Sequence, residues 1–189
     1  MTETDSAEVV GTIHKAVLHH LATWGWDGLD VDVVAEQSGC EASLIRERWE
    51  TLDDLVVDAL ATAQSQALAL REPPGNDLRG DLVFLLQGQA RDLAEDHGKA
   101  LRPLMTSRGT HPQLVRRVMS AVMVPRQQLW VQVVADAVAR GEARSRAMTP
   151  RVLAAGPRLL VAEDMDDGPL TDTHVEELVD EVVLPLLTR

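Results

Sequence analysis

Apolar residues recur at steps of three and four along most of this chain, the spacing that places side chains on one face of an α-helix. Between residues 6 and 24, the face is formed by Val9, Val10, Ile13, Ala16, Val17, Leu21 and Trp24. Strand-like alternation of apolar and polar residues is much rarer than this helical spacing. The pattern predicts an all-α protein.

The same spacing predicts further helices at about 31–37, 42–49, 52–71, 78–96, 99–107, 112–139, 149–164 and 172–187. Gly25 should end the first helix as a C-cap residue, and Asp30 suits the N-cap of the second. Pro125 and Pro157 lie inside predicted helices, where each is expected to kink the helix or to split it in two.

Glu72-Pro73-Pro74-Gly75 is the clearest internal boundary of the chain. We therefore expect an N-terminal domain at 1–51, a linker helix at about 52–71 and a helical C-terminal domain at 72–189.

Composition is ordinary for a globular protein, with 45% hydrophobic and 25% charged residues among 189. The N-terminus lacks the basic and apolar regions of a signal peptide, and no apolar run approaches the 18 residues of a membrane span. These features predict a cytoplasmic protein without a membrane segment. The net charge of −12 is uneven, because residues 1–60 hold three basic and thirteen acidic residues.

Three short helices within the first fifty residues, with Gly39 between the second and third, are typical of a helix-turn-helix unit. In the third helix, Ile45 and Trp49 are four residues apart and should face inward. Its other side chains should face outward, where the third helix of such a unit meets base edges. Helical bundles unrelated to DNA contain similar corners, so the pattern alone leaves that alternative open.

The stretch GWDGLDVDVVAEQSGCEASLIRERWETLDDLV, residues 25–56, resembles the N-terminal domain of the TetR family of transcriptional regulators. The residues in register with the family pattern are Gly25, Trp26, Asp27, Gly28, Val31, Val34, Ala35, Glu36, Gly39, Ile45, Trp49 and Leu55. The resemblance implies an all-α protein with a three-helix helix-turn-helix DNA-binding domain and a helical-bundle ligand-binding and dimerisation domain. It also implies a homodimer that binds palindromic operator DNA, most often as a repressor. A small-molecule effector would release this dimer from the DNA.

The resemblance assigns DNA contacts to Ala42, Ser43, Leu44, Arg46, Glu47, Arg48, Asp30 and Thr51. Several of the family's phosphate-binding positions differ in this chain. Asp30 and Asp32 stand where a Thr and a basic residue are frequent, and Leu52 replaces a Lys. Arg46 and Arg48 would have to supply most of the attraction to DNA. The alternative is a TetR-like protein that has lost DNA binding and acts through a protein partner, or as a ligand sensor, through its acidic N-terminal domain.

Residues of the second domain that could line an apolar effector pocket are Phe84, Leu85, Gln87, Met105, Met119, Met123 and Trp130. The alternative is that these residues are ordinary core. The Leu- and Val-rich segments at 149–187 could pair with a second subunit as a four-helix seam, or could fill the core of the monomer.

Other chemistry finds little support in the sequence. No nucleophile elbow, phosphate loop or dinucleotide-binding glycine pattern is present, so we expect neither an enzyme nor a cofactor. His14, His19 and His20 are not spaced to share a metal ion, and Cys40 is expected to be a small core residue.

Overall fold

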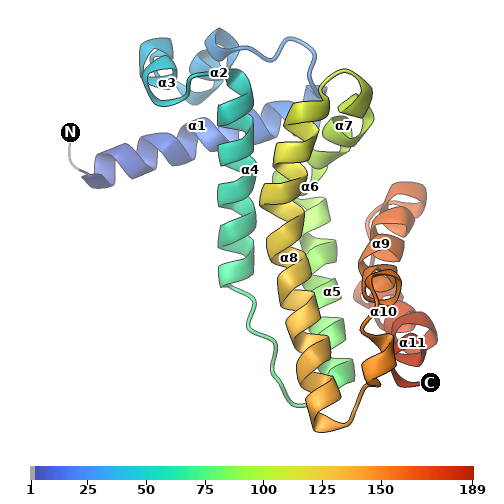
Figure 1. Ribbon diagram of the computed structural model, residues 1–189. Coiled ribbons are helices and arrows are strands. Elements are labelled where there is room, and N and C mark those ends of the chain that lie inside the picture. Colours follow the sequence, from blue (N-terminus) through green and yellow to red (C-terminus); the bar gives the residue numbers. More distant parts are fainter. Residues whose placement is uncertain (1–2) are drawn as a thin grey trace. The chain divides into compact units, whose positions relative to one another are not determined.

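The computed structural model describes residues 3–189, and every regular element in this range is helical, as the hydrophobic spacing predicts (Figure 1). No helix in the described range is long and apolar enough to cross a membrane. The chain divides into two compact units, Met1–Gln66 with Glu95–Val124 and Ala67–Ala94 with Pro125–Arg189.

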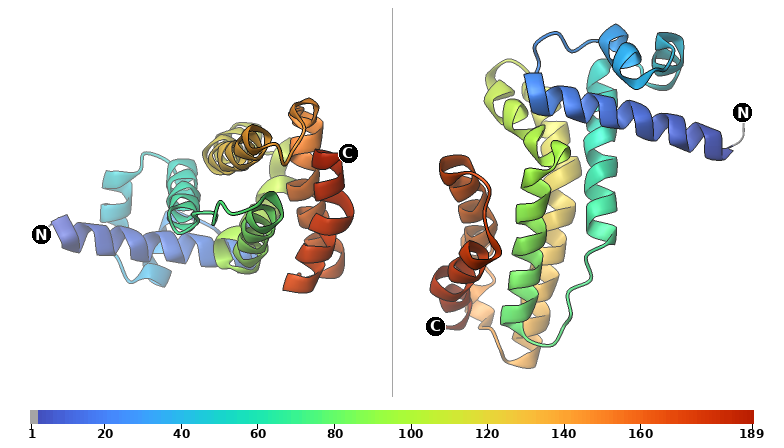
Figure 2. Two further views of the ribbon diagram at one scale, coloured as in Figure 1. Left: turned by 90° about the horizontal axis from the view of Figure 1, so that it is seen from below. Right: turned by 180° about the vertical axis from the view of Figure 1, so that it is seen from behind.

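The first unit contains the predicted helix-turn-helix segment. Its helices are α1 (Glu3–Trp24), α2 (Val31–Ser38), α3 (Ala42–Arg48), most of α4 (Leu52–Ala69), α6 (Asp96–Lys99), α7 (Leu101–Thr106) and the first part of α8 (Pro112–Arg140). Views from the front and from behind show α1 crossing α4 (Figures 1 and 2). The short helix α2 packs on α1, and α3 packs on α2.

Caps fix the end of α1 and the start of α2 where the sequence predicts them. Gly25 has a φ of +68°, and its N–H donates to the Leu21 carbonyl at 3.1 Å. Asp30 accepts a hydrogen bond from the Val33 N–H at 2.8 Å and so caps α2. These contacts satisfy backbone groups that a helix end leaves without a partner.

The core of the first unit joins α1, α2, α3, α4, α7 and α8. Ile13, Val17 and Leu21 of α1 are buried together with Val34, Ile45, Trp49, Leu55, Val56, Leu60, Leu104, Leu114, Val118 and Val122. Burying one such aliphatic side chain contributes about 1.5–3 kcal/mol, so this core fixes the position of α3 relative to α1 and α4.

The second unit is a helical bundle with its own core. It contains α5 (Leu78–Ala94), the rest of α8, α9 (Pro150–Asp167), α10 (Asp172–Leu178), a π-helical turn (Val179–Val183) and α11 (Leu184–Thr188). Both α9 and α10 pack on α5, and the view from below shows the C-terminal helices as a layer beside α5 (Figure 2). Packing is close at Gly156, where an added Cβ would lie 2.8 Å from a methyl of Val183.

Two expectations about the helices need correction, and a third is narrowed. Of the two outcomes expected at each internal proline, a kink or a split, the split does not occur, because α8 runs without a break from Pro112 to Arg140 through Pro125, and α9 likewise continues through Pro157. The segment 78–96 ends at Ala94, and α6 follows as a separate short helix. The last segment is interrupted by the π-helical turn. Pro185 cannot donate a backbone hydrogen bond and its ring crowds the carbonyl four residues earlier, which explains a wide turn at this point.

The boundary between the units differs from the predicted domain boundary. Residues 95–124, assigned from the sequence to the second domain, pack in the first unit. The functional division into a DNA-binding domain at 1–51, a linker helix and a ligand-binding domain at 72–189 stays a prediction.

Candidate nucleic-acid interface

The turn between α2 and α3 is built on Gly39. This residue has a φ of +67°, which disfavours a side chain, and its N–H lies 3.3 Å from the Glu36 carbonyl. The Cys40 N–H donates to the Ala35 carbonyl at 3.1 Å. The half-buried side chain of Cys40 packs against the first core, as expected for a small core residue. The chain can therefore begin α3 with only three residues between it and the end of α2.

Two inward side chains hold α3 on the unit. Ile45 and Trp49 are buried, as the four-residue spacing predicts. The Trp49 Nε1–H donates to Asp58 Oδ2 of α4 at 2.9 Å, and His14 Nε2 of α1 lies 3.2 Å from the same oxygen. Because a carboxylate only accepts, His14 must carry its proton on Nε2 in this contact. The carboxylate of Asp58 thus ties α1 and the end of α3 to α4.

Burial lowers the pKa of His14 below its usual value of 6.5, and the neighbouring carboxylate of Asp58 opposes this shift. The histidine ring also lies against the indole of Trp49, with 5.6 Å between ring centroids. The neutral form of His14 is therefore favoured next to the anchor of α3.

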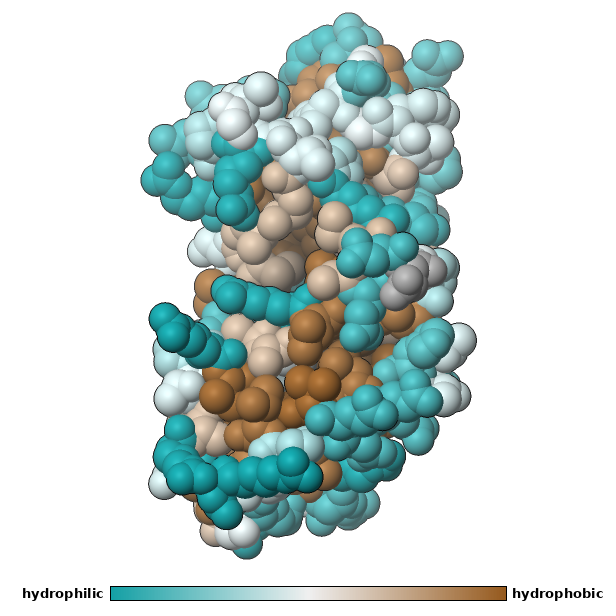
Figure 3. Space-filling view, turned by 90° about the vertical axis from the view of Figure 1, so that its right-hand side faces the viewer, coloured by the Kyte–Doolittle hydropathy of each residue, from teal (hydrophilic) through white to brown (hydrophobic). Residues whose placement is uncertain are grey.

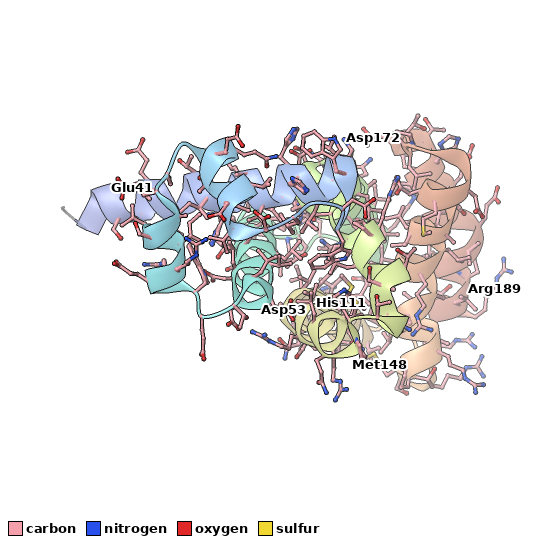
Figure 4. The ribbon with its side chains drawn as sticks, turned by 90° about the horizontal axis from the view of Figure 1, so that it is seen from above. Glu41, Asp53, His111, Met148, Asp172 and Arg189 are labelled. Carbon is pink, nitrogen blue, oxygen red and sulfur yellow. The ribbon has the colours of Figure 1, made fainter. Side chains whose placement is uncertain are left out.

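Ser43 and Glu47 form the centre of the outward face of α3. They lie one turn apart, about 160° from Ile45 around the helix axis. Both are exposed, and the Ser43 hydroxyl donates to Glu41 Oε2 at 3.2 Å. Figure 4 looks onto this side of the first unit, with Glu41 at the start of α3. Ala42 and Leu44 flank this centre, and Leu44 is 36% exposed.

Arg46 lies on the flank of α3 that faces α2. Its Nη2 donates to Asp32 Oδ1 at 2.6 Å, and both side chains are exposed. From its position in the sequence, Asp32 is expected only to repel phosphates. In the structure, it also neutralises the charge of Arg46.

Arg48 lies on the opposite flank, towards α1. Its guanidinium carbon lies 5.5 Å from the centroid of the Trp49 ring. With α1 it lines a shallow groove formed by Ser6, Val9, Val10, Ile13, Leu44, Glu47 and Arg48. The two arginines therefore serve different sides of α3.

The exposed side chains of Asp30 and Thr51 form hydrogen bonds within the protein that cap helices. Asp30 caps α2, while the Thr51 hydroxyl donates to Asp54 Oδ2 at 2.6 Å and accepts from the Asp54 N–H at 3.1 Å. The Thr51 hydroxyl and the Arg117 guanidinium together lower the pKa of Asp54. Thr51 therefore caps α4 firmly at the point where the chain leaves α3.

The residues predicted to line an effector pocket fall into both units. Phe84, Gln87 and Trp130 belong to the second unit, and Met105, Met119 and Met123 to the first. Trp130 is buried in the second core, and its Nε1–H has no hydrogen-bond partner among the described residues. Met105 is 44% exposed. Whether these side chains line a pocket stays a prediction.

Metal binding gains no support from the structure. The residues that the structure describes contain no cluster of three or more His, Cys, Asp or Glu placed to hold an ion. His19 instead lies 3.0 Å from Asp96, and His20 lies between the Asp27 carbonyl and the Gln37 amide.

Two residues important to the interface were not assigned these roles from the sequence. Asp58 accepts the hydrogen bond from Trp49 that holds α3, and Asp32 pairs with Arg46. The signal for Asp58 is a carboxylate beside the buried positions Leu55 and Ala59 of one helix. No comparable signal exists for Asp32, because its partner lies fourteen residues away on a different helix.

Comparisons with known proteins find matches to the C-terminal part and to most of the chain. Residues 72–182 match the family described as Tetracyclin repressor-like, C-terminal domain. An uncharacterized HTH-type transcriptional regulator of Mycobacterium tuberculosis is 28% identical over 173 residues, which cover 91% of this chain and 84% of that protein.

Solved structures share the fold. A Rhodococcus sp. protein assigned to the TetR family superimposes with a TM-score of 0.78 at 22% identity, over 94% of this chain and 99% of that one. A protein of Saccharomonospora viridis, described as a transcriptional regulator and solved in complex with choline, gives a TM-score of 0.69 at 15% identity, over 93% and 95% of the two chains.

Proposed function

Since the chain belongs to the TetR family of transcriptional regulators, we propose that it is a ligand-responsive repressor that binds a palindromic operator as a homodimer. The observation that carries this proposal is the exposed α3, held on the first unit by Ile45 and by the contact of Trp49 with Asp58. A short helix fixed in this way and presented after a tight turn fits the major groove of DNA.

The side chains available on α3 suggest how it would read DNA. Arg46 can present a pair of N–H groups to a guanine, and Glu47 can accept a hydrogen bond from the amino group of a cytosine. Thr51 and Asp30 contribute capped helix starts, where backbone N–H groups can approach phosphates.

Charge limits the strength of this binding. Residues 1–60 hold only three basic residues against thirteen acidic ones. If Arg46 and Arg48 are the main cations, a dimer neutralises about four phosphates, and log K should fall with log salt by about 4 or less. Specific contacts must then contribute an unusually large share of the affinity.

The homodimer is supported by an apolar face on the second unit. Hydrophobic side chains gather on the side formed by the C-terminal helices (Figure 3). Leu159 and Met165 of α9 and Leu186 of α11 are exposed, and Leu186 also lines a groove with Glu181, Val182, Pro185 and Arg189. A palindromic operator would require the two copies of α3 in such a dimer to reach half-sites about 34–36 Å apart.

The effector is proposed to be a small organic molecule bound in the second domain. The choline complex of the S. viridis protein shows that a protein of this fold binds one. In this chain, Trp130 offers a buried donor for a polar group of such a ligand. The effector would favour a dimer whose two copies of α3 no longer match the half-sites. Effector binding would then reduce the population of the DNA-binding state, and repression would decrease.

Fluorescence anisotropy with DNA that flanks the protein's own gene tests this proposal, across a series from low to physiological salt. We expect specific binding with a shallow salt slope. Arg46→Ala should abolish it, whereas Arg116→Ala, which removes an exposed arginine of α8 in the same unit, should change it little. Absence of binding even at low salt would overturn the proposal.

The second candidate is a TetR-like protein that acts through a protein partner or as a ligand sensor. The acidic balance of residues 1–60 and the neutralisation of Arg46 by Asp32 favour it. In that case the first unit should bind no duplex at low salt, and Asp32→Asn should not restore binding.

A further inference from the structure

The ion pair between Arg46 and Asp32 joins the outward parts of α2 and α3. Arg46 Nη2 lies 2.6 Å from Asp32 Oδ1, although the two side chains are 56% and 74% exposed. Asp32 is the only polar side-chain partner of Arg46 among the described residues. The carboxylate therefore holds a guanidinium at the edge of the face proposed to meet DNA.

An arginine held in this way is prepared for one particular contact. A guanidinium has five N–H donors in one plane, and the contact with Asp32 uses one of them. The remaining donors still include a parallel pair of the kind that binds the O6 and N7 atoms of guanine. Because the free side chain has many rotamers, fixing its plane in advance reduces the loss of freedom on binding.

The same carboxylate discourages the competing contact. A free arginine binds any phosphate through its charge, independent of sequence. Next to Asp32, the charge of Arg46 is largely neutralised, so attraction to phosphates falls while the directional donors remain. A pair between exposed side chains is weak in water, but it becomes stronger when DNA excludes the solvent.

We propose that Asp32 is a positioning residue that aims Arg46 at a guanine and thereby sets the base specificity of α3. This inference rests on the proposed DNA-binding function. It assigns to Asp32 a role opposite to simple repulsion, since removing the carboxylate should increase general affinity for DNA and reduce selectivity.

Selection from a randomised duplex DNA library, with the full-length protein, tests the inference. Wild type should select one guanine in each half-site over other bases by about 5- to 150-fold, the range of a good bidentate contact. Asp32→Asn should reduce this preference at that position by at least about fivefold and leave the other positions unchanged. Its binding to a duplex of unrelated sequence should become tighter, with a steeper salt slope.

Glu36→Gln is the matched control. Glu36 lies one turn after Asp32 on α2, is exposed, and makes no hydrogen bond or ion pair with Arg46. Both variants remove one negative charge, so both should tighten binding to unrelated DNA. Only Asp32→Asn should lose the guanine preference, which separates positioning from charge.

A circular dichroism melt checks that Asp32→Asn is folded, since Asp32 also lies in the first turn of α2. Should it be unfolded, Arg46→Lys provides the test, because lysine keeps the charge without the planar fork. It should lose the same guanine preference.

The outcomes distinguish the two proposals. A wild-type motif whose guanine survives in Asp32→Asn, or in Arg46→Lys, overturns the role of Asp32 alone. An equal loss of guanine preference in Glu36→Gln would also overturn it. If wild type selects no motif, the proposed function fails, and the role of Asp32 fails with it.

Discussion

Removing the Asp58 carboxylate should loosen the first unit at the point that holds α3. Asp58→Ala deletes the shared acceptor of Trp49 Nε1 and His14 Nε2, whose distances are 2.9 and 3.2 Å. A hydrogen bond to a charged group contributes about 1.5–3 kcal/mol, so two such bonds set an upper limit of about 6 kcal/mol.

The expected loss is smaller because water can reach this site. The side chain of Asp58 is 45% exposed, although that of His14 is only 7% exposed. Water can therefore replace part of the lost acceptor, and we expect a loss of about 2–3 kcal/mol in the free energy of unfolding. For a chain of this length, the melting temperature should fall by about 4–12 °C.

Thermal and urea unfolding, followed by circular dichroism, measure this loss. Asp53→Ala is the control, because Asp53 lies in the first turn of the same helix and no hydrogen bond among the described residues joins its side chain to α1 or α3. A double-mutant cycle with Trp49→Phe should give a coupling energy of about 0.5–1.5 kcal/mol. If Asp58→Ala unfolds within about 0.5 kcal/mol of wild type, the carboxylate does not anchor α3.

Three further changes probe other parts of the molecule. Burial lowers the folded-state pKa of His14 below 6.5, so the unfolded chain binds the proton more readily. The stability of wild type relative to His14→Gln should therefore be greatest above pH 6.5 and should decrease as the pH falls below it. A difference in urea unfolding that does not change with pH would contradict this. Gly39→Ala should cost about 1 kcal/mol and Gly39→Asn less, because asparagine tolerates the left-handed backbone of the turn, and equal melting temperatures for the two variants would count against this reason. Gly156→Ala should destabilise the second unit by about 1–3 kcal/mol in calorimetry through its contact with Val183, with Ala154→Gly on the same helix as the control for helix propensity; a variant as stable as wild type would show that the contact relaxes freely.

Local features of the first unit could be predicted from the sequence because each depends on neighbouring residues. The cap at Asp30, the glycine turn at Gly39 and the inward pair of Ile45 and Trp49 follow from spacing within a few residues. The family resemblance of residues 25–56 depends on the same local spacing, and the match of residues 72–182 to the family of the C-terminal domain confirms it.

Features that depend on contacts between distant segments could not be predicted in this way. The pairing of Arg46 with Asp32 requires the crossing of α2 and α3, and the role of Asp58 requires α1, α3 and α4 together. The continuity of α8 through Pro125 also differs from the local preference of proline. Packing of the rest of the helix can offset the loss of one backbone hydrogen bond.

The alternation of the chain between its two units limits how this protein can be recombined. A cut after residue 71 would leave the first unit without Leu104, Leu114, Val118 and Val122, which belong to its core. A chimera that exchanges only the first seventy residues with a homologue must therefore join two half-cores that did not evolve together. If α3 reads DNA as proposed, an exchange of specificity would transfer only the exposed residues of α2 and α3, with Asp32 and Arg46 moved as a pair.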